Sequence, residues 1–466
     1  MQLTRKNPFA LLFFFAALLL GGCGGGGATS TGGSGLTAQT ITFANPGTQT
    51  VGTPLTLSAT ASSGLAVAFT SATTSVCTVS GTTATFVAAG TCTIDANQAG
   101  NSTYAAASQV ADSFTVNAAS GQTTTVYIVG FASYTTADSN PTEWQLASSS
   151  STPIVTALPS PSGTNGNTST GIAVSGSNIY VSGRVIGANG NDTAAYWVNG
   201  TLETLPLPSG AIESWATGIA VSGSNVYVSG FVTANGSTGS AVYWVNGTPE
   251  TLPSPSGTTN AEATGIAISG NDVYVAGYAG LPTGNDETVA LYWVNGTPET
   301  LPSPSGTTNA EATAITVSGS DVYVAGYAYN NNSGSNGPAV YWANGTLETL
   351  PLPSGTTQAE ANAIAVSGNN VYVAGYAFNT NNNPQENGPA AYWMNGTLEP
   401  LSLPSGMTSA EANAIAVSGS SVYVAGFAYS NSTESAAYWV NGTPEILPAP
   451  SGTTGAVANA IAVSTQ

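Results

Sequence analysis

Histidine is absent from this sequence, and charge of either sign is rare. Only 5% of the 466 residues are charged, against roughly 25% in an average soluble protein. Without histidine, Ser-His-Asp and Cys-His catalytic sites are excluded, and so is metal binding by imidazole. Arg5 and Lys6 lie at the start, which leaves Arg184 as the single basic residue of the remaining chain, against 22 acidic residues. Such a chain cannot neutralise phosphates, so nucleic-acid partners are excluded.

Cysteine is also scarce, with 3 in the whole chain. Cys77 and Cys92 lie fifteen residues apart in a Val- and Thr-rich stretch. In an exported chain this pair predicts a disulfide, and the intervening Ser-Gly-Thr-Thr predicts a hairpin that joins the two cysteines. Zinc binding is disfavoured, because two thiols without histidine are too few ligands.

The first 22 residues are typical of an export signal. A basic start is followed by the apolar run Phe9–Leu20, which is too short to span a bilayer and suits a signal peptide. The junction Leu20-Gly21-Gly22-Cys23 resembles the lipobox of bacterial lipoproteins. The resemblance implies cleavage before Cys23, lipidation of its thiol, and a place in the bacterial cell envelope at the outer membrane, with the lipid as the only membrane contact. An ordinary signal peptide with an incidental cysteine is the alternative.

Residues 23–37 are rich in glycine and predict a flexible tether. Residues 38–118 alternate β-branched and polar residues between Gly, Pro and Asn clusters, which predicts a small antiparallel sandwich. This segment, with its paired Val-Cys-Thr-Val and Thr-Cys-Thr-Ile runs, resembles bacterial Ig-like modules. Residues 119–123 are the expected linker.

Residues 124–466 are repetitive, with a period in the range of solenoids and propellers. A tyrosine-containing segment, such as Val-Tyr-Val-Ala-Gly-Tyr, recurs at spacings of 53, 47, 47, 49, 49 and 51 residues and starts at Val126, Ile179, Val226, Val273, Val322, Val371 and Val422. Each of these seven units is expected to form four strands. An Asn-Gly dipeptide, the strongest hairpin signal, joins the third strand to the fourth at Asn199, Asn246, Asn295, Asn344, Asn395 and Asn441.

The two ends of this region complement each other. The first unit lacks its first strand, and the chain ends on a solitary first strand, Asn459–Gln466. The sequence therefore predicts an all-β protein, with the small Ig-like β-sandwich followed by a seven-bladed β-propeller that the C-terminal strand closes. A β-solenoid is the alternative fold, but a solenoid would not need its two ends to exchange a strand. The repeat, as in residues 261–302, resembles extracellular HAF-type repeats and, more loosely, kelch-like repeats, although the paired glycines of kelch are missing.

An acidic series recurs just before the first strand of a unit: Glu213, Glu262, Glu311, Glu360 and Glu411. If that strand is innermost, these carboxylates ring the channel mouth, where a cation would relieve their repulsion. Oxygen ligands suit Ca²⁺, with Glu262, Glu311 and Glu360 as the candidate ligands and no other cofactor expected. The alternative is that each carboxylate caps backbone N–H groups of its own loop. A second series is expected on the outer rim: Glu203, Glu250, Glu299, Glu348, Glu399 and Glu445.

Aromatic residues divide into two sets. The Tyr-Trp pairs of the third strands recur at the same position in every unit and predict core packing; they begin at Tyr196, Tyr243, Tyr292, Tyr341, Tyr392 and Tyr438. Candidates for exposed contacts are Tyr329, Phe378 and Tyr429 at the starts of the loops between second and third strands, and Trp215 in a loop before a first strand. The loops after the second strands vary most between units, which favours a binding surface, although unrestrained drift of solvated loops would give the same variation.

Three functions fit these observations. The preferred one is a monomeric, non-catalytic surface protein that binds a glycan, a matrix polymer or a surface protein through the variable loops. A carboxylate-based glycoside-cleaving enzyme is the second, but no acidic pair stands out from the repeats. A purely structural envelope component is the third.

Overall fold

The structure is a computed structural model. It describes residues 35–117, 123–134, 139–147, 152–161, 166–186, 190–234, 239–282, 287–330, 335–379, 388–430 and 433–465. These residues are all β, and they include no helix that could cross a membrane. The predicted signal peptide 1–22, Cys23, most of the tether 23–37 and nearly all of the linker 119–123 lie outside the described residues.

The N-terminal region contains nine short strands in three sheets, in the orders β1-β4, β2-β9-β8-β5 and β3-β7-β6. Side chains alternate along β8, where Cys92, Ile94 and Ala96 are fully buried between more exposed neighbours, as expected for a strand with one face on a core. The strands are β1 (Ile41–Phe43), β2 (Gln49–Thr50), β3 (Leu55–Thr56), β4 (Ala59–Ala61), β5 (Ala68–Ser71), β6 (Cys77–Ser80), β7 (Thr83–Phe86), β8 (Gly90–Asn97) and β9 (Val110–Asn117).

The predicted disulfide between Cys77 and Cys92 is confirmed. The Ser-Gly-Thr-Thr segment forms the predicted hairpin, since β6 pairs with β7 and Ser80 lies opposite Thr83. The expectation that this hairpin joins the two cysteines is wrong, because Cys77 lies opposite Phe86 while Cys92 lies in β8 of another sheet. The disulfide therefore connects two sheets through the core of this region, where both cysteines are fully buried.

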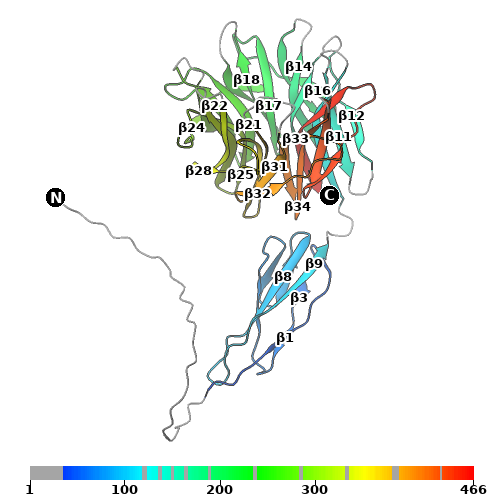
Figure 1. Cartoon of the computed structure of the whole chain (residues 1–466), viewed down its shortest axis with the longest axis vertical. Helices are drawn as coiled ribbons and strands as arrows, with labels where there is room; N and C mark the ends of the chain where they lie inside the picture. Colours follow the sequence, from blue (N-terminus) through cyan, green and yellow to red (C-terminus); the bar gives the residue numbers. More distant parts are fainter. Residues whose placement is uncertain are drawn as a thin grey trace, which may run out of the picture.

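The rest of the described chain forms seven four-stranded antiparallel sheets (Figure 1). Their innermost strands are β13 (Thr168–Ser175), β17 (Glu213–Ser222), β21 (Ala261–Ser269), β25 (Asn309–Ser318), β29 (Gln358–Ser367), β33 (Ser409–Ser418) and β37 (Gly455–Thr465). The second strands are β10 (Thr124–Ser133), β14 (Asn178–Ile186), β18 (Asn225–Thr233), β22 (Asp272–Gly280), β26 (Asp321–Asn330), β30 (Asn370–Phe378) and β34 (Ser421–Ser430).

The third strands are β11 (Ser139–Ala147), β15 (Asp192–Val198), β19 (Ser240–Val245), β23 (Thr288–Val294), β27 (Ser335–Ala343), β31 (Ala390–Met394) and β35 (Thr433–Val440). The outermost strands are β12 (Ile154–Ala157), β16 (Thr201–Thr204), β20 (Thr248–Thr251), β24 (Thr297–Thr300), β28 (Thr346–Thr349), β32 (Thr397–Pro400) and β36 (Thr443–Ile446). Each innermost strand contacts the innermost strands of the two neighbouring sheets, and β37 contacts both β33 and β13. The sheets therefore form a closed ring, which is the architecture of a β-propeller.

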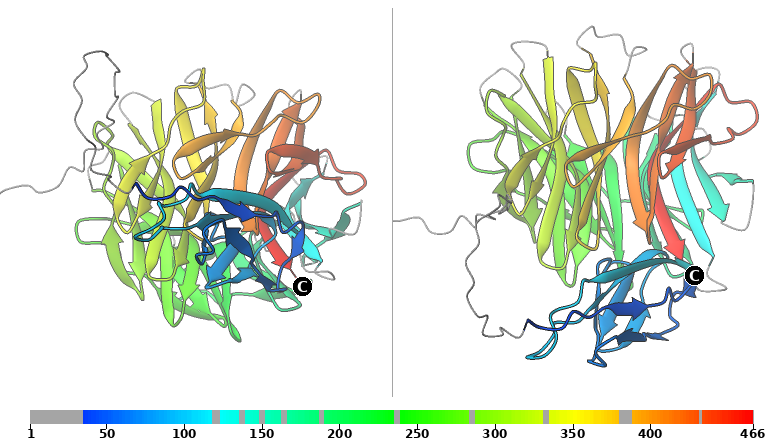
Figure 2. Two further views of the ribbon diagram at one scale, coloured as in Figure 1. Left: turned by 90° about the horizontal axis from the view of Figure 1, so that it is seen from below. Right: turned by 60° about the horizontal axis from the view of Figure 1, so that its bottom comes forward.

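The predicted exchange of strands between the two ends is confirmed. The sheet that holds β10, β11 and β12 takes β37 as its innermost strand, with Thr124 opposite Thr465 at one end of the pairing and Ser133 opposite Gly455 at the other. The N-terminal region lies at one edge of the ring, beside the turn between β33 and β34 (Figure 2). We call this the turn edge, and we call the opposite edge, where second strands end and third strands begin, the loop edge.

A β-bulge in every innermost strand links each sheet to the next. At the bulge one residue has no partner in the second strand, and its side chain donates a hydrogen bond to a backbone carbonyl of the next innermost strand. The donors are Thr170, Thr217, Thr264, Thr313, Asn362, Asn413 and Asn459, at distances of 2.7–3.0 Å. The last bond, from Asn459 to Ser169, closes the ring.

The tryptophans of the third strands form a second set of bonds between sheets. All seven are fully buried, as predicted for those in the Tyr-Trp pairs, and each indole Nε1 donates to a carbonyl that follows the outermost strand of the preceding sheet. Gly277 lies between such an indole and the bulge: a Cβ there would meet the Glu262 carbonyl at 2.0 Å and the Trp293 ring at 2.9 Å. This close approach explains the glycine of the repeated Val-Tyr-Val-Ala-Gly-Tyr segment.

The Asn-Gly turns are confirmed as left-handed two-residue hairpins. The six asparagines all have φ near 50°, and the glycines that follow them have φ of 76–82°, as a type I′ turn requires. Each asparagine Oδ1 also accepts the backbone N–H at the second residue of the second strand, as Asn295 does from Val273.

We expect deletion of residues 455–466 to abolish cooperative unfolding of the ring, because β33 and β13 would lose their shared neighbour and β10 would become an open edge. The Asn459→Ala variant is the control, since it removes one side-chain hydrogen bond at a cost of about 1 kcal/mol and keeps β37. Calorimetry of both variants measures the difference. A truncated chain that melts with the enthalpy and temperature of the control would contradict the role given to β37.

Candidate functional site

Four carboxylates occupy one position on four consecutive sheets near the loop edge. Glu262, Glu311, Glu360 and Glu411 each lie two residues before the bulge residue of their innermost strand. The prediction that they precede the strand is wrong, because β21, β25, β29 and β33 begin at or before them. Glu213 does not belong to this set: Trp215 stands at the matching position of β17, opposite Phe231, and Glu213 lies two residue pairs nearer the loop edge.

Tyrosine hydroxyls hold three of these carboxylates. Tyr278 donates to Glu262 at 2.6 Å, Tyr327 to Glu311 at 2.7 Å, and Tyr376 to Glu360 at 2.9 Å. In each pair the tyrosine lies directly opposite its glutamate in the second strand. These three hydrogen bonds come from side chains, whereas the alternative interpretation expects backbone N–H donors from the loops.

The carboxylates lie in the crevices between neighbouring sheets. Thr288, at the start of β23, donates its hydroxyl to Glu311 of the next sheet at 3.4 Å, and the Tyr329 hydroxyl donates to the same carboxylate at 2.8 Å. Burial raises the pKa of Tyr278, Tyr327 and Tyr376, and the neighbouring glutamates raise it further. These phenols consequently remain hydrogen-bond donors across the physiological pH range.

The predicted exposed aromatics lie within strands rather than in loops, and each is half-buried. They are paired with other rings: Tyr329 stacks on Tyr327 with centroids 5.9 Å apart, and Phe378 stacks on Tyr376 at 5.4 Å. Trp215 stacks on Phe231 at 4.7 Å, and Tyr429 meets Phe427 edge-on at 5.1 Å. Tyr329, Phe378 and Tyr429 are in strands because the second strands continue beyond the repeated Val-Tyr-Val-Ala-Gly-Tyr segment, and Trp215 lies in the innermost strand β17. Aromatic pairs thus accompany the carboxylates along the loop edge.

The β33 sheet breaks this pattern. Phe427 stands where the other three sheets have tyrosine, and the Tyr429 hydroxyl reaches Glu411 only at 3.5 Å. Burial raises the pKa of Glu411 to about 7, with further contributions from Glu360 and from Glu434 of β35, and the Tyr429 hydroxyl opposes the rise. Burial also raises the pKa of Glu434. Two carboxyl groups with raised pKa values therefore lie at one place in the ring.

The opposite side of the ring carries the positive charge. Arg184 occupies the tyrosine position of β14, opposite Thr168, and forms an ion pair with Asp192 at 2.7 Å. In the described part of the chain no three His, Cys, Asp or Glu side chains gather closely enough to hold a metal ion. A calcium ion at Glu262, Glu311 and Glu360 would therefore have to bridge three sheets.

The outer-rim glutamates lie in the outermost strands as predicted, where all are exposed except the half-buried Glu399. Tyr438 donates to Glu445 at 2.6 Å. This contact ties the outermost strand to the third strand and places neither residue near the loop edge.

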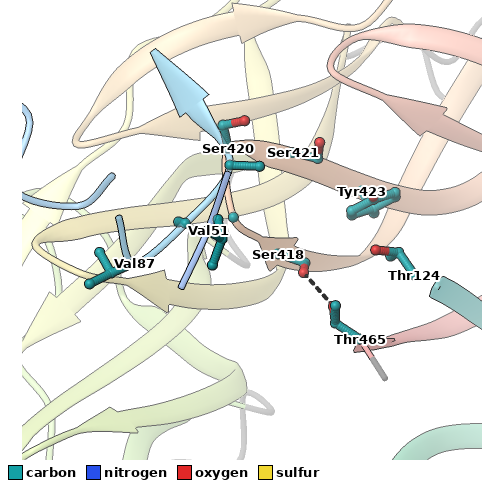
Figure 3. Close-up of a pocket in the computed structure, with 11 residues that line it drawn as sticks. Val51, Val87, Thr124, Ser418, Ser420, Ser421, Tyr423 and Thr465 are labelled. Atoms are coloured by element: carbon teal, nitrogen blue, oxygen red, sulfur yellow. Dashed lines mark hydrogen bonds between the residues drawn. The ribbon is translucent and has the colours of Figure 1, made fainter. Parts of the chain in front are cut away.

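One groove lies at each edge of the ring. One, of about 380 Å³, separates the N-terminal region from the turn edge and is lined by Val51 and Val87 on one side and by Ser420 and Tyr423 on the other (Figure 3). Ser418 and Thr465 share a hydroxyl hydrogen bond of 3.1 Å there. The other, of about 280 Å³, lies at the loop edge between β35 and the start of β37 and includes Glu434.

We expect the stability of the ring to fall as the pH rises through the range in which Glu411 ionises. Because its pKa is higher in the folded chain than the usual 4.5, the stabilisation from its protonated form is complete below about pH 4.5 and is lost above about pH 7. At about pH 8 the Glu411→Gln chain should therefore be more stable than the natural chain, by on the order of 1–3 kcal/mol in the free energy of unfolding. At about pH 4 the two chains should be equally stable.

Phe427→Tyr is the matched variant, because it supplies the hydroxyl that Glu262, Glu311 and Glu360 already receive. It should lower the pKa of Glu411 and flatten the loss of stability. Thermal unfolding measured across this pH range compares the three chains. Parallel pH profiles would contradict the ionisation assigned to Glu411.

No family model matches the chain, and no curated protein matches it. The resemblances to lipoproteins, Ig-like modules and HAF-type or kelch-like repeats stay predictions. Similar solved structures include an acylaminoacyl peptidase of Pyrococcus horikoshii (TM-score 0.42, 12% identity, 71% of this chain and 51% of that one) and a puromycin-hydrolyzing peptidase of Mycobacterium tuberculosis (0.43, 12%, 69% and 53%). A third is the β-propeller domain of the Trilobed protease from Pyrococcus furiosus (0.43, 10%, 70% and 93%). This chain spans about half the length of each of the two peptidases, and at such identities the likeness carries no activity across.

Proposed function

We propose that this chain is a lipid-anchored protein of the bacterial cell envelope in which an Ig-like sandwich presents a seven-bladed β-propeller. The seven four-stranded sheets and their closure by β37 support the propeller assignment. The disulfide between sheets and the alternating burial along β8 support a sandwich. The basic start, the apolar run and Cys23 support export and a lipid anchor at the outer membrane.

The propeller binds a glycan or a glycan-containing matrix polymer at the loop edge. The observation that carries this proposal is the half-buried aromatic pairs Tyr327–Tyr329 and Tyr376–Phe378 beside Glu311 and Glu360. These two carboxylates stand in a row that continues to Glu262 on one side and to Glu411 on the other. The apolar face of a sugar ring packs on an aromatic ring, and carboxylates accept hydrogen bonds from sugar hydroxyls. The N-terminal region lies at the turn edge, so the loop edge is the one turned away from it (Figure 1).

Glycoside cleavage is the second candidate, because one observation favours it. Glu411 has a pKa raised to about 7 beside Glu360, and carboxyl pairs with separated pKa values serve as acid and nucleophile or base in glycosidases. Binding is preferred, since Glu360 repeats a tyrosine-held arrangement that Glu262 and Glu311 share. A purely structural role and a protein partner remain the other outcomes of a ligand screen.

We expect the Tyr329→Ala, Phe378→Ala double variant to lose at least about tenfold in affinity for a glycan found on a glycan array. Each aromatic contact contributes about 0.5–1.5 kcal/mol beyond buried area, and 1.4 kcal/mol corresponds to tenfold. Tyr292→Ala is the control, because this half-buried tyrosine lies mid-strand in β23 beside the outer-rim Glu299. Circular dichroism confirms folding of each variant.

Arrays run in calcium chloride and in EDTA also test the calcium prediction, since a bridging ion would make binding depend on calcium. Assays for reducing ends on every bound glycan test cleavage. An array and a surface-protein pull-down that both capture nothing would refute the binding proposal, and steady release of reducing ends would replace it with the enzyme.

The lipid anchor has its own test. The natural chain expressed in a Gram-negative host should partition into the detergent phase of a Triton X-114 extraction, and Cys23→Ser should move it to the aqueous phase, because the acyl chains supply the apolar surface. Mass spectrometry of the N-terminal peptide identifies the acyl groups. Detergent-phase partitioning of the Cys23→Ser chain would contradict lipidation at this residue.

A further inference from the structure

One of the seven outermost strands differs from the other six. β12 lies on the outside of the ring, and its outward side has no strand partner among the described residues (Figure 1). Its sequence is Ile-Val-Thr-Ala, whereas the other six strands have threonine first and glutamate third. β12 is therefore the only one of the seven described outermost strands without a charged side chain. Ile154, its first residue, is 61% exposed.

The register of β12 shows which of its backbone groups point outward. The Leu158 N–H donates to the Pro141 carbonyl at 2.8 Å, next to the pairing of Ala157 with Thr142. Every second residue of an antiparallel strand bonds a given neighbour, so Val155 and Ala157 direct their N–H and C=O groups away from the sheet. Four of the other outermost strands have proline, which lacks an N–H, at one of these two positions: Pro249, Pro298, Pro400 and Pro444. β12 keeps both outward donors.

Two copies of β12 can pair antiparallel across a two-fold axis. Val155 of each copy would then exchange a pair of backbone hydrogen bonds with Ala157 of the other. Thr156 lies between them and would face its own counterpart, and Thr–Thr pairs across strands are favourable. The same pairing of any other outermost strand would bring two glutamates face to face, and like charges directly opposite are destabilising. Self-pairing is therefore disfavoured at six outermost strands and permitted at β12.

The acidic residue that lies across from Thr156 does not oppose this contact. Glu143 lies opposite Thr156 in β11, one strand inside the edge. In a pair of copies the two Glu143 residues would be three strand spacings apart, about 14 Å, which exceeds the Debye length at physiological salt. Ile154 is two residues from Thr156 on the same face, so it would lie beside the second copy and lose part of its exposure.

We propose that β12 joins two copies of this chain through an antiparallel, edge-to-edge contact. The contact is short, so the dimer is weak and reversible, in place of the monomer expected from the sequence. Antiparallel pairing points the loop edges of the two rings in opposite directions and leaves both open. If the loop edge binds a glycan as proposed above, the dimer presents that surface twice and cross-links a polymer. The dimer itself does not depend on glycan binding.

Sedimentation velocity of the full chain tests the contact, with Cys23→Ser in every sample so that no acyl group associates the copies. We expect a concentration-dependent dimer, and Val155→Pro should weaken it at least about tenfold because each copy loses an outward donor. Leu202→Pro is the matched control, since it makes the same change at the same position of β16 and should leave dimerisation unchanged. The natural prolines at this position of β20, β24 and β36 show that the fold accepts proline there, and calorimetry checks both variants.

A cysteine variant tests the register of the pairing. Thr156→Cys should form a disulfide between copies under mild oxidation, because facing residues without backbone bonds between them have Cα atoms about 4.5 Å apart, within disulfide range. Glu203→Cys is the matched control at the same position of β16, and it should form far less of the cross-linked dimer.

Three results would overturn the inference. The first is a chain that stays monomeric up to about 300 μM, since a weaker contact would not be specific. The second is a dimer that Val155→Pro leaves intact or that both proline variants weaken equally. The third is equal cross-linking of the two cysteine variants. Glycan binding is measured separately on the array, so the proposed function stands or fails independently of the dimer.

Discussion

The β-bulge of the innermost strands is the constraint on which the rest of the ring depends. By leaving one residue unpaired in its own sheet, each bulge frees a threonine or asparagine side chain to bond the next sheet. The bulge also brings a carbonyl so close to the second strand that only glycine fits there, and the indole of the third strand packs over that glycine. One bulge per sheet therefore determines how the neighbouring sheet is bonded, why the second strand requires glycine, and where the tryptophan ring packs.

Much of this architecture follows from local sequence chemistry. Asn-Gly predicts a specific turn geometry, tryptophan at a constant position predicts burial, and an incomplete unit at each end predicts closure; the structure has all three. The hydrogen bonds from the bulge residues to the next sheet cannot be predicted in the same way, because threonine and asparagine also occur frequently in turns. The bulge also sets the register, so spacing alone placed Glu213 with the other glutamates where the structure has Trp215.

The sequence predicts which residue types make up the candidate site, but it does not predict where in the ring they lie. Glutamates and aromatics were expected in loops around a channel, whereas they lie on strands in the crevices between sheets and contact one another there. One departure from the repeated pattern distinguishes Glu411 from Glu262, Glu311 and Glu360: the residue opposite it is Phe427, where the other three glutamates face a tyrosine. Repeats make such a difference visible, because the three preceding sheets show the glutamate–tyrosine arrangement from which the β33 sheet departs.

The closure by β37 also decides how the ring carries mechanical load. If lipid at the N-terminus holds the protein while a ligand pulls at the loop edge, tension reaches the ring at Thr124, the first residue of β10. That pull acts along β10, parallel to its strand axis, against pairing with β37 over the whole length from Thr124 to Ser133 and with β11 on the other side. The hydrogen bonds are then loaded in shear and must yield together instead of opening one after another. A strand donated from the far end of the chain thereby makes the point of attachment resistant to force.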